Sequence, residues 1–119
     1  MPLAPEHISK AEHNEKLADT LCKGSYLDWA VTVTFYAALH YVDAILAASV
    51  IHPETHTERN DAVGANATLQ KVRAEYRTLE TLSRNARYRS MKIEPADIQE
   101  AQNSFSALRA HLRNRMKLE

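Results

Sequence analysis

Glycine and proline are scarce in this chain of 119 residues, which has two glycines and four prolines. A sandwich or barrel of short β-strands needs many turns, and these two residue types make most of them. Their scarcity therefore favours helices. Gly24 and Gly64 also lie forty positions apart. That separation excludes a phosphate-binding loop and a dinucleotide fingerprint, because both need clustered glycines.

Cysteine is nearly absent as well, since Cys22 stands alone. A lone cysteine excludes an internal disulfide and a cysteine-rich zinc site, and it is typical of a reducing compartment. No charged segment precedes an apolar stretch at the N-terminus, and the uncharged run over residues 29–42 is shorter than the roughly 20 residues that span a bilayer. We therefore expect a single cytoplasmic domain without a cofactor or a membrane partner.

Apolar residues recur at helical spacing in four segments. Start and stop signals predict helices near residues 5–22, 26–50, 57–88 and 95–115, the third of them launched by a capping box of Thr55 and Glu58. The second segment is apolar on nearly every face, which predicts a central helix covered on several sides. Because short connections force neighbouring helices to be antiparallel, the predicted fold class is all-α, an antiparallel up-down four-helix bundle.

Charge is balanced overall but not along the chain. Residues 1–61 carry four basic and nine acidic side chains, whereas residues 62–119 carry eleven and six. The basic excess peaks between residues 71 and 92, a segment that includes Arg84, Asn85, Arg87, Tyr88 and Arg89. Arginine forks bind phosphate and a neighbouring tyrosine stacks on a base, so this pattern suits RNA or a nucleotide. A solvated helix end, where cations favour the helix dipole, is the alternative.

Tyr36, His40 and Asp43 are spaced four and three apart in the second predicted helix and so share one face. An imidazole one turn from a carboxylate is expected to have a raised pKa and a fixed orientation. That arrangement serves a general acid or base, and it serves equally well as a satisfied structural hydrogen bond.

A second polar group surrounds the connection between the second and third predicted helices, and with His40 it offers metal-ligand chemistry: His52, His56, Glu58 and Asp61. Helical metal sites normally place two ligands at i and i+3 or i+4 on one helix, as in His-Glu-x-x-His. The chain contains neither His-Glu-x-x-His nor Glu-x-x-His. We therefore predict a capped, solvated loop and no metal site.

Three features together resemble the HEPN superfamily, the small helical domains of prokaryotic toxin and defence systems. They are the aromatic and alanine-rich segment 29–47, the histidine-containing loop 56–60, and the long third helix that ends in residues 84–88. The resemblance covers nearly the whole chain. It implies a helical bundle, a homodimer, an RNA or nucleotide ligand, and a nucleotidyltransferase-like antitoxin as a protein partner.

Many HEPN proteins are metal-independent ribonucleases, in which an Arg, usually followed by a polar residue such as Asn, precedes a catalytic His by a few positions. The resemblance implies that this pair lies in a homodimer cleft and promotes attack of a 2′-hydroxyl on its own phosphate. Arg84 and Asn85 match the opening of this signature, and Arg59 and Asn60 form a second such pair, but no histidine follows either before His111.

The leading hypothesis is therefore a homodimer that binds RNA or a nucleotide without efficient cleavage. Its basic cleft is built by Arg84, Asn85, Arg87, Tyr88 and Arg89, with Arg59 as a further contact. One alternative is a ribonuclease in which His40 or His56 supplies the missing base to Arg84. The other is a structural or regulatory interaction module with no affinity for nucleic acid.

Overall fold

The computed structural model describes residues 2–88 and 91–118 of the chain. These residues form six α-helices and no strand, so the prediction of an all-helical chain is confirmed. The helices are α1 (Ala4–Cys22), α2 (Leu27–Ala48), α3 (His56–Ala65), α4 (Ala67–Gln70), α5 (Arg73–Tyr88) and α6 (Pro95–Arg115).

Local signals set several of the helix starts. The Thr55 hydroxyl accepts a hydrogen bond of 3.0 Å from the backbone N–H of Glu58, as the predicted cap of α3 requires. The carboxylate of Glu58 accepts from the backbone N–H of Glu54 at 2.8 Å, one residue earlier than a standard capping box. At the start of α6, Asp97 accepts from the backbone N–H of Glu94 at 2.8 Å.

The single helix predicted over residues 57–88 is wrong, because the structure divides it into α3, α4 and α5. Asn66 has an extended backbone (φ −103°, ψ 122°), and its side chain accepts a 3.0 Å hydrogen bond from the backbone N–H of Leu69. Asn66 therefore ends α3 and caps α4, since asparagine competes with the helix for backbone groups and Gly64 weakens the preceding turn. Despite the break, residues spaced three or four apart across α4 and α5 line one buried seam: Leu69, Val72, Tyr76, Leu79 and Ser83.

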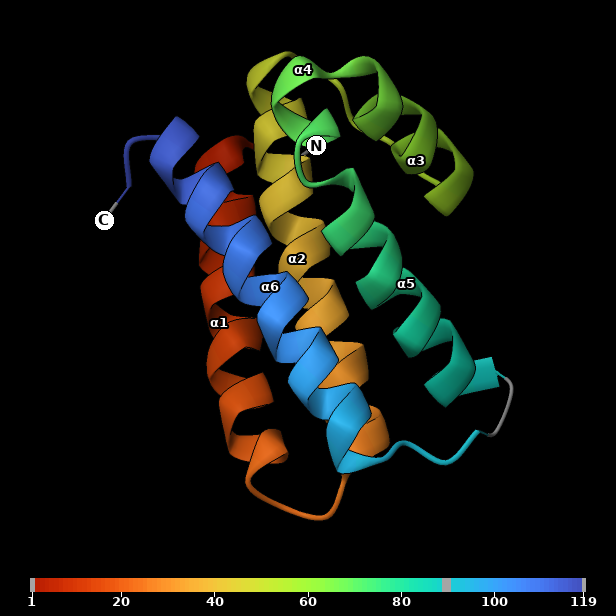
Figure 1. Cartoon of the computed structure of the whole chain (residues 1–119). Helices are drawn as coiled ribbons and strands as arrows, with labels where there is room; N and C mark the ends of the chain where they lie inside the picture. The colour runs from red at the N-terminus through yellow and green to blue at the C-terminus, as the bar shows by residue number, and fades with distance from the viewer. Residues whose placement is uncertain (1, 89–90, 119) are drawn as a thin grey trace.

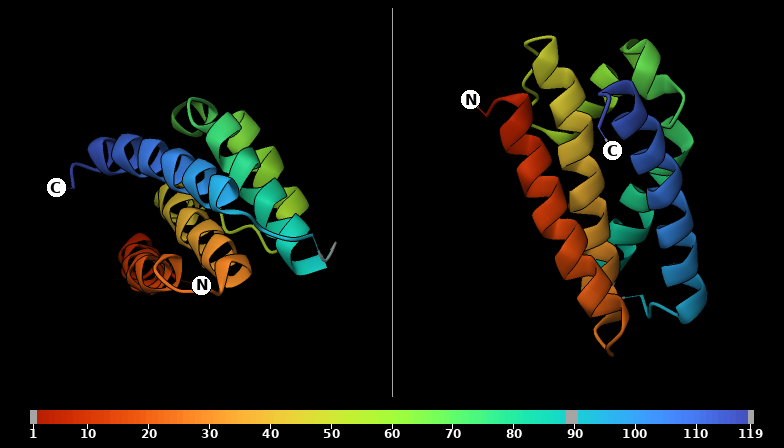
Figure 2. Two further views of the ribbon diagram at one scale, coloured as in Figure 1. Left: turned by 60° about the horizontal axis from the view of Figure 1, so that its bottom comes forward. Right: turned by 90° about the vertical axis from the view of Figure 1, so that its left-hand side faces the viewer.

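The central position predicted for the second helix agrees with the packing of α2. Thirteen of its 22 residues are buried, and it packs against α1, α5 and α6. Figure 1 shows α1 and α2 running in opposite directions, as do α5 and α6, and both views of Figure 2 place α1 beside α2. α3 and α4 lie at the end of the molecule where α2 finishes and α5 begins (Figure 1).

By length and composition, α2 is also the one helix in the described part of the chain that could cross a membrane. Of its most apolar stretch, however, 72% is buried inside the fold. Side chains of other helices already cover that surface, as in the core helix of a soluble protein. At the α5 side of this core, the rings of Phe35 and Tyr76 lie 5.6 Å apart, with 0% and 1% of each residue exposed. These two rings form the floor beneath the candidate site.

Candidate functional site

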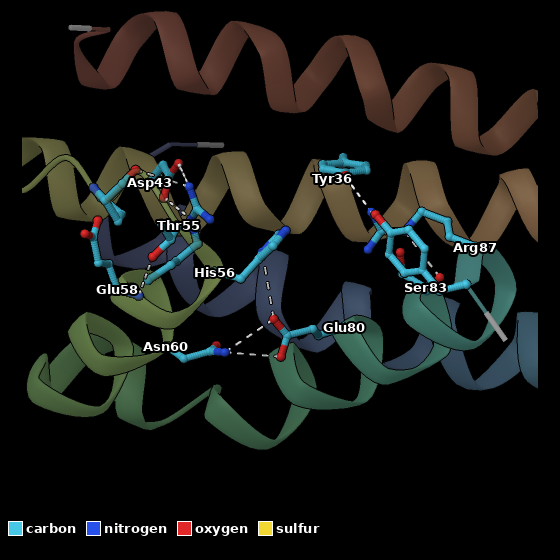
Figure 3. A network of polar contacts seen from close by, with 12 residues as sticks. Tyr36, Asp43, Thr55, His56, Glu58, Asn60, Glu80, Ser83 and Arg87 are labelled. Atoms are coloured by element: carbon cyan, nitrogen blue, oxygen red, sulfur yellow. Dashed lines mark hydrogen bonds and ion pairs between the residues drawn. The ribbon is translucent and has the colours of Figure 1, made fainter.

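The candidate site lies where α2, the start of α3 and the second half of α5 meet (Figure 3). Two clusters of polar contacts are found there. One surrounds Arg87 near the end of α5, and the other joins His56 of α3 to Glu80 of α5. A separate ion pair between Asp43 and Arg59 fastens α3 to α2.

Arg87 is held by hydroxyl groups and aromatic rings. Its Nη1 donates hydrogen bonds to the hydroxyl of Tyr36 at 2.8 Å and to that of Tyr88 at 3.3 Å. Its guanidinium carbon lies 4.7 Å from the ring centre of Tyr88, 5.4 Å from that of Tyr36 and 6.0 Å from that of Phe35. Rings and neutral hydroxyls orient a guanidinium without cancelling its charge. Among the described residues no carboxylate pairs with it, so Arg87 keeps a net positive charge.

Arg84 lies one helical turn before Arg87 and is exposed. No residue in the part of the chain that the structure describes forms a hydrogen bond or an ion pair with it. Tyr88 is 72% exposed and so offers part of its ring to solvent. Asn85 is half-buried, and its backbone carbonyl accepts a 3.4 Å hydrogen bond from the backbone N–H of Met91. Arg89, the remaining residue of the predicted cleft, lies outside the described residues.

His56 reaches the same region from the start of α3. Its ring centre lies 6.0 Å from that of Phe35, and its Nδ1 lies 4.0 Å from Oε2 of Glu80. Burial lowers the pKa of His56, and the positive charge of Arg59 adds to this effect. Arg87 and Arg84 lower that pKa further, whereas Glu80 opposes them. His56 therefore lies within electrostatic range of both arginines, and its neutral, proton-accepting form is favoured.

Glu80 itself was not identified from the sequence. Its side chain is 11% exposed and accepts hydrogen bonds from the Nδ2 atom of Asn60 at 3.3 and 3.4 Å. The signal was present, because an acid between the apolar residues Leu79 and Leu82 is unusual on a packed helix. Glu80 thus ties α5 to α3 through Asn60 and lies within ion-pair distance of His56.

Arg59 has a structural environment that differs from that of Arg87. Its Nε and Nη2 donate to the two carboxylate oxygens of Asp43 at 2.7 and 3.0 Å, and the two side chains are 10% and 8% exposed. A bidentate pair of this kind uses both the charge and the donor geometry of the guanidinium. The structure therefore places Arg59 inside the fold, away from the solvent that a ligand would cross.

The polar unit expected from Tyr36, His40 and Asp43 does not form. Tyr36 contacts Arg87, Asp43 pairs with Arg59, and His40 instead meets His7 of α1, with 3.2 Å between their Nδ1 atoms. The expected rise in the pKa of His40 is also wrong. Burial lowers this pKa to about 4 and His7 adds to the effect, so the nearby Asp43 does not compensate. In the described structure nothing connects His40 to Arg84.

Two buried hydroxyl groups beside the site lack hydrogen-bond partners among the described residues. They belong to Ser83, which is 0% exposed, and Tyr76, which is 1% exposed. Burial also raises the pKa of Tyr76. An unpaired buried hydroxyl costs roughly 1–3 kcal/mol, and such groups concentrate at functional sites. Both residues belong to the buried seam of α4 and α5.

Comparison with known proteins supports the resemblance seen in the sequence. A model of the HEPN domain family matches residues 4–114, which is nearly the whole chain. The chain belongs to the HEPN family. No curated protein and no solved structure matches it.

Within this HEPN domain, the residues considered as metal ligands do not come together as one cluster in the described structure. No group of three or more His, Cys, Asp or Glu side chains gathers at metal-binding distance in the residues that the structure describes. Glu58 serves the cap of α3, and His56 faces Phe35 and Glu80. The ribonuclease signature that opens with Arg84 and Asn85 still lacks its histidine on α5. The histidine whose pKa Arg84 helps to lower is His56, which belongs to α3.

Proposed function

We propose that this HEPN domain binds single-stranded RNA or a nucleotide through a surface on α5 formed by Arg84, Arg87 and Tyr88, here called the arginine face. One observation carries the proposal. Arg87 is held in a fixed direction by aromatic rings and neutral hydroxyls, without a carboxylate, beside the exposed Arg84 and Tyr88. A guanidinium already ordered in this way loses little side-chain entropy when it meets a phosphate.

The three side chains suit different parts of an RNA strand. Arg84 and Arg87 supply planar sets of donors for phosphate oxygens, and the exposed ring of Tyr88 offers a flat surface to a base. HEPN membership supports a role connected with RNA or nucleotides at the level of the family.

Other parts of the proposal concern architecture and setting. We interpret α1, α2, α5 and α6 as an antiparallel up-down four-helix bundle, with α3 and α4 inserted between α2 and α5. We further infer a cytoplasmic homodimer that acts in a toxin-antitoxin or defence context, with a nucleotidyltransferase-like antitoxin as its partner. Co-purification of such a partner from the native host and sedimentation of the purified chain test these two associations.

A binding titration tests the arginine face. Fluorescence anisotropy of a labelled single-stranded RNA should show binding at low salt that weakens steeply as salt rises, because phosphate contacts release counterions. Arg84→Ala removes one such contact and should weaken binding about 3- to 10-fold, with a salt slope lower by about 1. Arg115→Ala is the matched control, since Arg115 is an exposed arginine at the opposite end of the molecule from the end of α5 (Figure 1). Absence of binding at low salt, or equal effects of the two substitutions, would refute the arginine face.

A second candidate function is ribonuclease activity with His56 as the general base. It is favoured because His56 lies beside Phe35 and Glu80 on the α5 side of the core, and the charges of Arg84 and Arg87 help to lower its pKa. In this reaction His56 takes the proton of a 2′-hydroxyl, and the 2′-oxygen attacks the adjacent phosphorus to form a 2′,3′-cyclic phosphate. The bond from phosphorus to the 5′-oxygen breaks, the 5′-oxygen leaves as a hydroxyl with a proton from water, and an arginine stabilises the charge that develops on the phosphate.

RNA cleavage in the presence of a chelator tests this second function. A metal-independent nuclease should still cut, and His56→Ala should abolish cutting while His13→Ala, a change to an exposed histidine of α1, leaves it intact. RNA that stays whole with the wild-type protein rejects the nuclease and leaves the binding proposal standing.

A further inference from the structure

A groove adjoins the arginine face between the first turns of α2 and the last turn of α5. It has a volume of about 330 Å³ and is lined by Asp28, Trp29, Thr32, Ala86 and Arg87. A second hollow of about 540 Å³ shares Asp28 and Ala86 with it and extends to Lys92. The first volume lies at the lower end of the range for small-molecule sites, roughly 300–1,000 Å³. Arg87 thus belongs both to the arginine face and to the wall of this groove.

Trp29 gives the groove an exposed aromatic wall. It is the single tryptophan of the chain and is 56% exposed, although it belongs to the most apolar helix. Tryptophan is highly buried on average, and it is enriched where a protein binds partners or bases. Stacking of a base on such a ring contributes substantially to single-strand binding and tolerates every base. The opposite wall includes Ala86, whose small side chain leaves room for a flat ligand.

Asp28 gives the same groove an acceptor. Its backbone carbonyl accepts a 2.8 Å hydrogen bond from the hydroxyl of Thr32, but no described residue donates to its carboxylate. An ionised carboxylate only accepts hydrogen bonds and repels phosphate. It therefore suits the part of a nucleotide that carries N–H groups, which is the edge of the base.

The four bases differ in what they offer to a carboxylate. Guanine presents two adjacent donors, N1–H and the N2 amino group, on its Watson–Crick edge, and these match the two oxygens of a carboxylate. Adenine and cytosine present one amino group on that edge. The single N–H of uracil lies between two carbonyl oxygens, which a carboxylate repels. A bidentate pair discriminates between bases by roughly 5- to 150-fold.

We propose that this groove is a nucleobase subsite selective for guanine. The indole of Trp29 stacks on the base, the carboxylate of Asp28 accepts from its N1–H and N2–H, and Arg87 binds the adjoining phosphate. This inference rests on the proposed binding of RNA at the arginine face, and it adds the identity of the preferred base. Lys92, an exposed residue that lines the second hollow and lies 3.9 Å from the carboxylate of Glu94, is available to the continuing strand.

The tryptophan makes a direct test available, because every change in indole fluorescence reports on Trp29. Full-length protein is titrated with two short RNA oligomers, an all-uridine strand and the same strand with one guanosine at its centre. The guanosine strand should quench the fluorescence and bind at least about 5-fold more tightly than the uridine strand. Equal quenching and equal affinity for the two strands would overturn the subsite.

Substitutions separate the two parts of the subsite. Asp28→Asn should reduce the preference for guanosine to less than about 2-fold while binding of the uridine strand is kept or improved, because a negative charge is removed. Glu6→Gln, a change to another exposed acid in a first helical turn, is the matched control and should leave the preference unchanged. Trp29→Leu should weaken the binding of both strands by about 5-fold or more, and Trp29→Phe should recover part of the loss. Anisotropy of labelled strands measures both affinities.

The outcomes distinguish this inference from the proposed function. The subsite is overturned if Asp28→Asn leaves the preference for guanosine unchanged, or if Trp29→Leu leaves the affinity for both strands unchanged. In either case, weaker RNA binding by Arg84→Ala would still support the arginine face. Absence of binding by either strand overturns both. Fluorescence of Trp29 that changes with protein concentration and not with RNA would show that this surface contacts a second copy of the chain, which also overturns the subsite.

Discussion

Acid should destabilise this protein through His40, which packs against His7 between α1 and α2. The pKa of His40 is lowered from its ordinary 6.5 to about 4, first because of burial and then because of the charge of His7. Lys10 and Arg59 act in the same direction, and Asp43 alone opposes them. The folded chain therefore resists a proton that the unfolded chain accepts.

The sign and the size of the effect follow from proton linkage. Above the ordinary pKa of 6.5, both states leave His40 neutral and its contribution to stability is fully present. As the pH falls from 6.5 towards about 4, the unfolded state binds the proton first, so the free energy of unfolding falls. The depression of the pKa corresponds to a loss of at most about 3 kcal/mol. Because His40 is only partly buried, we expect a loss of about 1–3 kcal/mol.

Urea unfolding followed by circular dichroism measures this loss across the pH range. His40→Gln removes the titrating group and retains an amide able to hydrogen-bond His7. The difference in the free energy of unfolding between wild type and His40→Gln should shrink by about 1–3 kcal/mol as the pH is lowered from about 7.5 to about 4.5. The carboxylates and His56, whose pKa is also lowered, contribute equally to both proteins and cancel in the difference.

His13→Gln is the control, because His13 is an exposed histidine on the same helix as His7. Its difference from wild type should not change with pH by more than about 0.5 kcal/mol. A His40→Gln difference that is equally flat would show that His40 titrates normally in the folded state. The packing of α1 on α2 would then have no role in acid sensitivity.

Three further substitutions separate structural from binding roles. Arg59→Ala leaves the buried carboxylate of Asp43 unpaired and should lower the free energy of unfolding, measured with urea, by about 3–5 kcal/mol. Arg59→Lys should recover only part of this loss, because lysine cannot make the bidentate contact. Ser83→Ala removes a buried hydroxyl that has no described partner and should leave the free energy of unfolding unchanged or raise it by up to about 1 kcal/mol; a loss above about 1 kcal/mol would contradict this. Tyr36→Phe removes the acceptor nearest to Arg87. It should weaken RNA binding about 2- to 5-fold, measured by anisotropy, and lower the free energy of unfolding by about 1 kcal/mol, measured by urea unfolding. Unchanged RNA affinity would mean that the orientation of Arg87 does not matter for binding.

The helical content and the central place of the second helix could be predicted from the sequence. Both depend on the composition and apolar spacing of a single segment, which do not require knowledge of its neighbours. The break of the third predicted helix could not be predicted from spacing alone. Leu69 of α4 and Tyr76 of α5 belong to the same buried seam on the two sides of the interruption at residues 71–72, so the apolar spacing continues where the helix does not. The cap made by Asn66 was the local signal for the break.

The candidate site could be predicted only in part, for a related reason. Spacing along α2 predicts that Tyr36, His40 and Asp43 share a face, but successive turns of a long helix pass different neighbours. Tyr36 meets α5, His40 meets α1 and Asp43 meets α3. The order of residues along α2 does not show which neighbouring helix packs against each of its turns. The same limit hid the proximity of His56 on α3 to Glu80 on α5, since the two helices are adjacent only in the folded chain.

The contrast between Arg59 and Arg87 explains why we assign a structural role to Arg59 and a ligand-binding role to Arg87. Both are oriented by two or more contacts, yet the partner of Arg59 is an anion and the partners of Arg87 are neutral. The carboxylate of Asp43 balances the charge of Arg59, so a phosphate could displace Asp43 only by leaving a buried charge unpaired. Hydroxyls and rings fix the direction of Arg87 but leave its charge to be matched from outside. Substitution of Arg59 should therefore change the free energy of unfolding much more than RNA affinity, whereas changes around Arg87 should alter RNA affinity at little cost in stability.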